Sequence, residues 1–179
     1  MRGWLRRFWW LAGAGLAALA VAVWLVWPSS GGRAEPVERA RGFVDFTVCV
    51  LTDARGVAGS DAAPVWQGVL TAQKSTNAKT QYLATLGDGS VGAAVISLNT
   101  LAARGCGLIV AVGASQSAAV WKQAEVFPLR HFVVVGGFAL AKLANVAVIV
   151  EQAPDAVASK VSALAAGAVA GRFVSGPVS

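Results

Sequence analysis

Residues 105–117 read GCGLIVAVGASQS, and this stretch decides the fold class. At its centre, 108–112 are five consecutive apolar residues rich in β-branched side chains, which is typical of a strand covered on both faces. Gly105, before the run, is suited to ending a helix, and the segment GASQS after it is suited to starting one. The stretch therefore predicts a helix–strand–helix passage in a parallel α/β sheet.

Four further apolar runs extend this prediction along the chain. They are FTVCVL (46–51), the weaker TQYLA (80–84), FVVV (132–135) and VAVIV (146–150). Segments of helical period separate most of these runs, so the expected element order is βαβαβαββα. Right-handed crossovers then make the expected fold a doubly wound parallel sheet of the Rossmann-like or flavodoxin-like class.

Four helices are predicted from residues that commonly start or end a helix and from apolar stripes at helical spacing. The expected starts are Asp61, Ser90, Ser115 and Pro154, and the second and third helices are expected to end at Gly105 and Pro128.

A ligand of such a sheet lies beyond the carboxyl ends of the strands, where the strand order reverses. Asp53 could accept hydrogen bonds from a ligand there, or it could cap a turn through its own backbone. Gly113, Gly136 and Gly137 could let a ligand approach the backbone, or they could only form tight turns. The loops expected at this edge are 52–60 (TDARGVAGS), 113–117 (GASQS) and 136–142 (GGFALAK).

The sequence lacks the usual parts of an enzyme. Ser115 lies in a G-x-S-x-S segment without the closing glycine of a nucleophile elbow, and the one histidine, His131, is expected at the opposite end of the sheet. One histidine, two isolated cysteines and scattered carboxylates have no metal-ligand spacing, and no dinucleotide fingerprint or P-loop lysine is present. We therefore expect a protein that is not an enzyme and has no metal or cofactor.

The N-terminal part has the composition of a membrane anchor. Residues 9–27 (WWLAGAGLAALAVAVWLVW) carry no charge and, as a helix, would span roughly 28 Å, close to the hydrocarbon thickness of a bilayer. Tryptophans lie at both ends, and the preceding arginines place residues 1–8 in the cytoplasm. The predicted organisation is thus a basic N-terminus (1–8), a transmembrane anchor (9–27), a linker (28–43) and an extracytoplasmic α/β lobe (44–179). A cleaved secretory signal is the alternative, and it also exports the lobe.

Composition and charge narrow the range of partners. Hydrophobic residues make up 56% of the 179 residues and charged residues 13%, so the chain is more apolar than an ordinary soluble protein. The net charge of +6 is concentrated in residues 1–41, which hold six basic and two acidic side chains. No basic cluster with interleaved aromatic residues occurs beyond them, so nucleic acid is not an expected partner.

The expected compartment and the expected strand geometry give opposite predictions for whether the two cysteines form a disulfide. Export favours a disulfide between Cys49 and Cys106. If the first and third strands end level with each other, however, Cys106 lies beside Phe46 and roughly 11 Å from Cys49, beyond the reach of a disulfide. The sequence therefore predicts two buried thiols.

The order and spacing of five segments resemble the first lobe of the basic membrane protein family of bacterial ABC-transporter substrate-binding proteins. The segments are VCVLTDARGV, WQG, LAARGCGLIVAVG, FPLRHFVVVGG and NVAVIVEQ. The resemblance covers residues 46 to about 171. It implies the type 1 periplasmic-binding-protein fold, a purine nucleoside as ligand and an ABC-transporter permease as partner.

Compared with that family, the sequence lacks several ligand contacts. Ala62 or Ala63 stands where the family has an aromatic residue that stacks on the base, and Gly136 and Gly137 stand where it has an aspartate for the sugar. The length allows one lobe, whereas the family closes two over its ligand. The ligand-binding residues expected from the loops and the resemblance are Asp53, Gly56, Gly113, Ser115 and Gly137.

Together these features predict a membrane-anchored, extracytoplasmic lobe of substrate-binding type whose nucleoside binding is weak or lost. The alternative is a protein–protein interaction module that pairs with itself or with a partner lobe.

Overall fold

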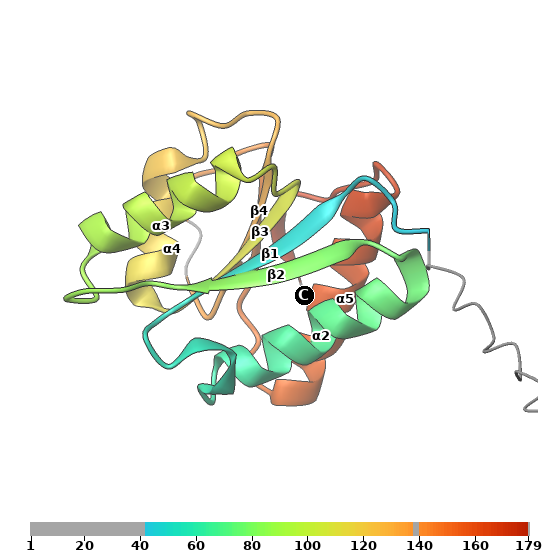
Figure 1. The fold of residues 1–179 in the computed structure, drawn as a ribbon, viewed down its shortest axis with the longest axis horizontal. Helices are drawn as coiled ribbons and strands as arrows, with labels where there is room; N and C mark the ends of the chain where they lie inside the picture. Colours follow the sequence, from blue (N-terminus) through green and yellow to red (C-terminus); the bar gives the residue numbers. More distant parts are fainter. Residues whose placement is uncertain (1–41, 138–139, 179) are drawn as a thin grey trace, which may run out of the picture. The chain divides into compact units, whose positions relative to one another are not determined.

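A computed structural model describes residues 42–137 and 140–178 (Figure 1). They belong to one compact unit, Arg41–Ser179. The predicted anchor at 9–27 and most of the predicted linker at 28–43 lie outside the described residues. Within the residues that are described, no helix is both long enough and apolar enough to cross a membrane.

The described chain alternates strands and helices almost throughout. The strands are β1 (Thr47–Thr52), β2 (Lys79–Ala84), β3 (Leu108–Val112), β4 (His131–Val135), β5 (Val146–Ile149) and β6 (Gly176–Val178). The helices are the short 3-10 helix η1 (Gly56–Ala58) and the α-helices α2 (Ala62–Thr76), α3 (Val91–Ala103), α4 (Ala114–Gln123) and α5 (Pro154–Val169).

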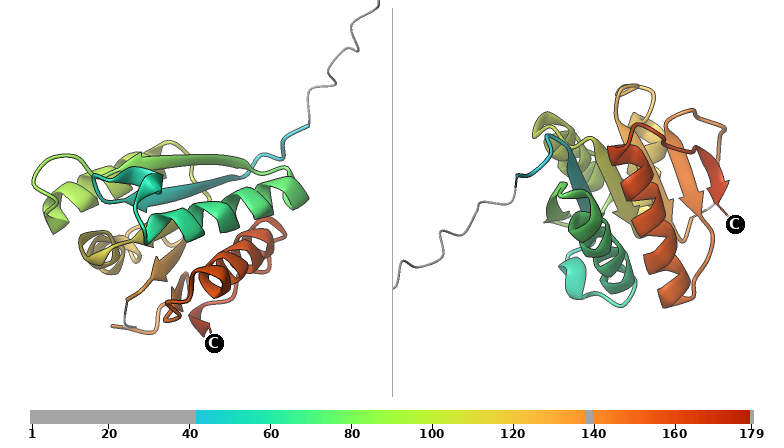
Figure 2. Two further views of the ribbon diagram at one scale, coloured as in Figure 1. Left: turned by 90° about the horizontal axis from the view of Figure 1, so that it is seen from below. Right: turned by 90° about the vertical axis from the view of Figure 1, so that its right-hand side faces the viewer.

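All six strands of the described sheet are parallel, in the order β2-β1-β3-β4-β5-β6. The order reverses between β1 and β3, because the chain first adds β2 on one side of β1 and then builds outward on the other. Helices α2 and α5 cover one face and α3 and α4 cover the other (Figure 2). The predicted doubly wound α/β fold is confirmed.

The pattern of β1 shows how two cores form on one sheet. Because successive side chains of a strand point to opposite faces, Val48 and Val50 enter the core under α2 and α5, while Cys49 and Leu51 enter the core under α3 and α4. All four side chains are at most 1% exposed. Burial of each such aliphatic side chain contributes about 1.5–3 kcal/mol, so an uninterrupted apolar run suits this position.

The close packing of α2 against α5 depends on Gly68. A Cβ at this position would collide with the carbonyl oxygen of Ala158 in α5 and lie 3.0 Å from the Cβ of Val161. A glycine therefore lets the two helices approach at this point.

Most predicted helix ends are confirmed. Ser90 caps α3 by accepting a hydrogen bond from the amide of Ala93 at 3.2 Å, and Gly105 follows the helix with a φ of +84°. Asp61 precedes α2, although its side chain makes no capping bond. The prediction for α4 is wrong at both ends, because the helix begins directly after Gly113 instead of at Ser115 and ends at Gln123, before the expected end at Pro128.

The sequence analysis missed β6 and expected only five strands. Residues Gly176–Val178 pair in parallel with Ala147–Ile149 of β5. This strand is short and contains Pro177, which lacks a backbone donor, so it has neither the length nor the apolar pattern of the other five. Lys160 of α5 helps to hold it, because its Nζ donates to the carbonyl of Val178 at 3.5 Å.

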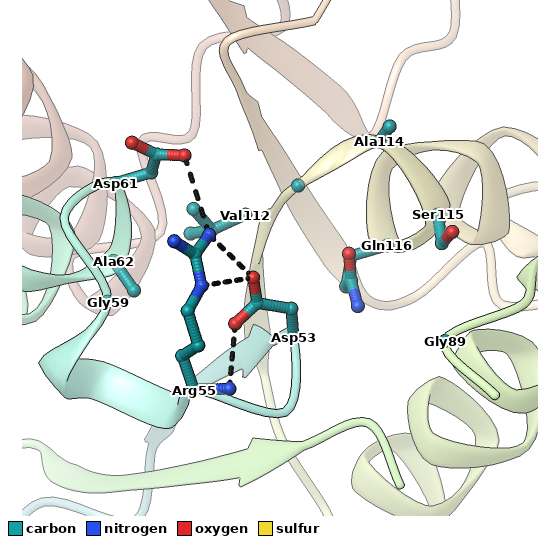
Figure 3. Close-up of a pocket in the computed structure, with 11 residues that line it drawn as sticks. Asp53, Arg55, Gly59, Asp61, Ala62, Gly89, Val112, Ala114, Ser115 and Gln116 are labelled. Atoms are coloured by element: carbon teal, nitrogen blue, oxygen red, sulfur yellow. Dashed lines mark hydrogen bonds and ion pairs between the residues drawn. The ribbon is translucent and has the colours of Figure 1, made fainter. Parts of the chain in front are cut away.

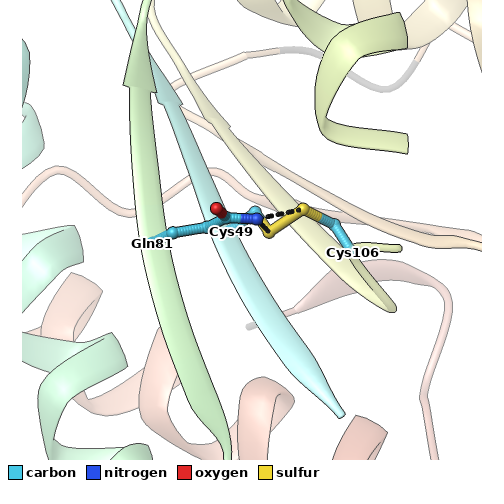
Figure 4. The surroundings of a disulfide bond; sticks show 3 residues. All are labelled: Cys49, Gln81 and Cys106. Atoms are coloured by element: carbon cyan, nitrogen blue, oxygen red, sulfur yellow. Dashed lines mark hydrogen bonds between the residues drawn. A yellow bond between two sulfur atoms is a disulfide. The ribbon is translucent and has the colours of Figure 1, made fainter. Parts of the chain in front are cut away.

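The prediction of two thiols is wrong, because Cys49 and Cys106 form a disulfide with their Cα atoms 5.9 Å apart (Figure 4). The prediction extended β3 in a straight line back to Cys106. In the structure the ladder stops at Gly107, whose amide donates to Thr47, and the amide of Cys106 donates to Leu101 at the end of α3. Cys106 therefore belongs to the turn that leaves α3 and lies over the sheet face where Cys49 points.

Candidate functional site

The loops after β1 and β3 meet at the carboxyl edge of the sheet, where the strand order reverses. Between them lies an open cavity of about 290 Å³ (Figure 3). Its lining includes Asp53 and Arg55 from the loop after β1, Asp61 before α2, and Ser115 and Gln116 in the first turn of α4.

Arg55 donates three hydrogen bonds to the Asp53 carboxylate. Oδ1 of Asp53 accepts from the backbone amide of Arg55 at 2.9 Å, and Oδ2 accepts from its Nε at 2.9 Å and its Nη2 at 2.8 Å. These side-chain bonds are the main reason that the pKa of Asp53 lies below its ordinary value of 3.8. The same pairing raises the pKa of Arg55, and Asp61 lies 4.0 Å from its Nη2. Asp53 thus caps a turn, the second of the two interpretations of the sequence.

Gly113 and Gln116 fix the junction between β3 and α4. Gly113 has a φ of +110°, and a Cβ there would lie 2.5 Å from Oε1 of Gln116. The Gln116 side chain is 2% exposed, and its Nε2 donates to the carbonyl of Thr52 at 3.2 Å and to Oγ1 of Thr85 at 3.0 Å. The glycine is therefore required by backbone conformation and by the packing of Gln116, a residue that the sequence analysis did not single out.

Ser115 and His131 lie at opposite ends of the sheet, as predicted. Ser115 follows the carboxyl end of β3, whereas His131 is the first residue of β4. His131 stacks on Phe173 with ring centroids 4.4 Å apart, and partial burial lowers its pKa from 6.5. The structure therefore provides no pairing of this serine with the histidine.

A larger open groove of about 780 Å³ extends along the same edge, past the carboxyl ends of β3 and β4 to the segment that follows β5. Apolar side chains line much of it, among them Trp121 of α4 and Val157 of α5, and the carboxylates of Asp61 and Glu151 lie in its walls. Its volume is in the range of small-molecule sites. Trp121 was not singled out from sequence, because it belongs neither to a motif nor to the apolar stripe from which the helix was predicted.

Four of the five predicted site residues line one or both of these cavities. Three of them line the smaller cavity. Gly113 is one of these three and also lines the larger groove, where Gly137 lies as well. Gly56 lines neither, because it is buried in η1 with a φ of +64°. The residues at the smaller cavity are Asp53, Gly113 and Ser115.

Among the described residues that line the smaller cavity, none is aromatic. Ala62, one of the two residues that stand where the basic membrane protein family carries a stacking ring, lies in the wall of this cavity. In the part of the chain that the structure describes, no three His, Cys, Asp or Glu side chains are grouped so as to hold a metal ion.

Solved structures of other proteins have a similar fold. A fragment of a chain from Peptoclostridium difficile 630, described as a lipoprotein, matches 71% of this chain over 98% of its own length, with 22% identity and a TM-score of 0.53. A solute-binding protein of an ABC transporter system from Aeropyrum pernix K1 matches 58% of this chain with 21% identity and a TM-score of 0.50. The lobe has a periplasmic-binding-protein-like fold. It spans only 28% of the length of the Aeropyrum protein. The sequence matches no protein-family model and no curated protein.

Proposed function

We propose that this chain is a membrane-anchored, extracytoplasmic lobe of the solute-binding type, related to the basic membrane protein family, that binds purine nucleosides weakly or not at all and is not an enzyme. One observation carries the proposal: a lobe with the fold of solute-binding proteins has an open cavity at the carboxyl ends of β1 and β3. In doubly wound sheets this switch point is where ligands bind.

The disulfide supports a location outside the cytoplasm. Cys49 and Cys106 are both fully buried and bonded to each other, and such structural disulfides persist mainly in oxidising compartments. The apolar segment at 9–27 and the arginines before it favour the same compartment, with the lobe attached to the membrane.

Weak nucleoside binding is expected because the smaller cavity lacks several contacts to a ligand. Asp53 is already bonded to Arg55, so a ligand hydroxyl would have to compete with a charged partner for it. Loss of a stacking ring removes on the order of 1 kcal/mol, and loss of a charged hydrogen bond to the sugar removes about 1.5–3 kcal/mol. Since 1.4 kcal/mol is about tenfold in affinity, these two losses weaken a micromolar site by about two to three decades, and the burial that a second lobe would supply is lost as well, so the expected dissociation constant is about millimolar or weaker.

Calorimetry with adenosine, guanosine and inosine tests this proposal on the full chain in detergent. The expected dissociation constant is about millimolar or weaker, and Asp53→Ala and Ser115→Ala reduce any measurable heat. Asp45→Ala is the matched control, since Asp45 is an exposed aspartate before the amino end of β1 and lines neither cavity. A micromolar dissociation constant that neither substitution changes would contradict both the expected weakness of binding and its location at Asp53 and Ser115.

The larger groove favours a second candidate, an interaction module. An open and largely apolar groove at the edge where two-lobed proteins place their second lobe suits a protein surface as well as a small molecule. Size-exclusion chromatography with and without nucleoside separates the two functions. Association with a partner lobe that nucleoside does not alter supports the module, whereas a nucleoside-dependent change supports the solute-binding lobe.

A further inference from the structure

The described sheet has two edge strands, β2 and β6, and only β6 is protected from pairing with another strand. β6 is three residues long, contains Pro177, and has the carbonyl of Val178 occupied by Lys160. β2 is six residues long, contains neither proline nor glycine, and pairs with β1 without a bulge from Lys79 to Ala84. Figure 1 shows β2 as the outermost strand next to β1. Natural sheets commonly protect such an edge with proline, a bulge or charge.

The hydrogen-bonding pattern shows which groups of β2 face outward. The amides of Lys79 and Thr85 donate to β1, at 2.9 and 2.8 Å. Since alternate residues of a parallel strand bond to the same neighbour, the amides and carbonyls of Thr80, Tyr82 and Ala84 point away from β1. No described strand pairs with them.

The side chains of this edge suit another β-strand. Tyr82, at its centre, is 49% exposed and packs edge-to-face on Trp66 of α2, with ring centroids 5.6 Å apart. Leu86, just beyond the strand, is 75% exposed. The one charged side chain, Lys79, lies at the end of the strand, with its Nζ 3.1 Å from Asp45.

We propose that β2 pairs antiparallel with β2 of a second copy of this chain, joining two sheets into one across a twofold axis at Tyr82. In this register Tyr82 faces its own mate and Thr80 faces Ala84, so every outward amide and carbonyl finds a partner in about six hydrogen bonds. Lys79 faces Thr85, which keeps the two lysines apart. Because β6 is blocked, the assembly stops at a dimer.

This dimer goes beyond the proposed function and does not depend on it. No residue of β2 lines either cavity at the carboxyl edge. A chain that fails to bind nucleoside would therefore not contradict the dimer. A chain that is monomeric would not contradict the proposed binding site.

Cysteine cross-linking of the full chain in detergent tests the register. Facing residues of a hydrogen-bonded antiparallel pair have Cα atoms about 5.5 Å apart, within reach of a disulfide. Tyr82→Cys should therefore cross-link to its mate under mild oxidation. Lys79→Cys is the matched control, because the same register separates it from its mate by roughly 20 Å. Cross-linking of both variants to the same extent, or of neither, would overturn the register.

Analytical ultracentrifugation tests the edge itself. Tyr82→Pro removes an outward amide without removing a bond to β1, and should abolish the dimer. Tyr82→Ala keeps that amide and should still dimerise, so it controls for the lost ring. The N-terminal segment is present in every variant, so association through it would be common to all. A monomeric wild-type chain, or a Tyr82→Pro chain that dimerises like wild type, would refute the proposal.

Discussion

Removal of the Cys49–Cys106 disulfide should cost much of the stability of the lobe. The bond joins residues 57 positions apart, and a cross-link that closes a loop of this size stabilises the folded state by about 4 kcal/mol in the chain-entropy treatment. Both cysteines are fully buried, so the alanine replacements also remove two buried sulfur atoms and leave a small cavity, which adds to the cost of the lost bond. For a unit of about 140 residues, this loss lowers Tm by roughly 10–15 °C.

Thermal unfolding followed by circular dichroism checks this prediction on wild type and on the Cys49→Ala/Cys106→Ala double variant. Reductant should lower the Tm of wild type to near that of the variant and leave the variant unchanged, which separates the bond from any packing defect. The reasoning is refuted if reductant leaves wild type unaffected and labelling of unfolded, unreduced protein finds two free thiols.

Three further predictions concern single side chains. Gly68→Ala should destabilise the lobe by about 1–3 kcal/mol in chemical denaturation, because the new methyl group meets the backbone of α5. Gly92→Ala on α3 is the control: its methyl group would make only an ordinary contact, 3.6 Å from Oγ of Ser90, so it should be neutral or stabilising by up to about 1 kcal/mol. Equal effects of the two substitutions would contradict the packing argument. Arg55→Gln should raise the pKa of Asp53 towards 3.8, measured by carbon NMR of the carboxyl group, and an unmoved pKa would show that the pair does not form. Burial lowers the pKa of His131 in the folded chain, so the unfolded chain binds a proton at this residue more readily. The stability of the lobe should therefore decline as the pH falls below 6.5, and His131→Phe should remove that decline. A series of melting curves at different pH values measures both.

Local chemistry made much of the fold predictable. Ser90 and Gly105 mark the ends of α3 through a side-chain cap and a left-handed backbone, both of which depend on the residue itself. The wholly apolar run at 108–112 likewise predicts burial on both faces, and all five residues are buried. The edge strand β2 gave a weaker signal because only one of its edges is paired and its side chains are partly exposed.

The features that the sequence did not reveal depend on tertiary geometry. The disulfide forms because the chain turns at Gly107 instead of extending β3, which strand spacing alone does not indicate. Arg55 stands two residues after Asp53, and only the folded turn brings its guanidinium back to the carboxylate. Gln116 has no sequence pattern of its own, and its role appears only when α4 sits against the ends of β1 and β2.

Amide NMR of the lobe titrated with adenosine tests the central claim most directly, because it reports the place and the strength of binding together. The account predicts shifts confined to residues 53–60 and 113–117, without saturation below about millimolar nucleoside. Saturation at micromolar nucleoside, or shifts centred at the amino edge around His131, would contradict it.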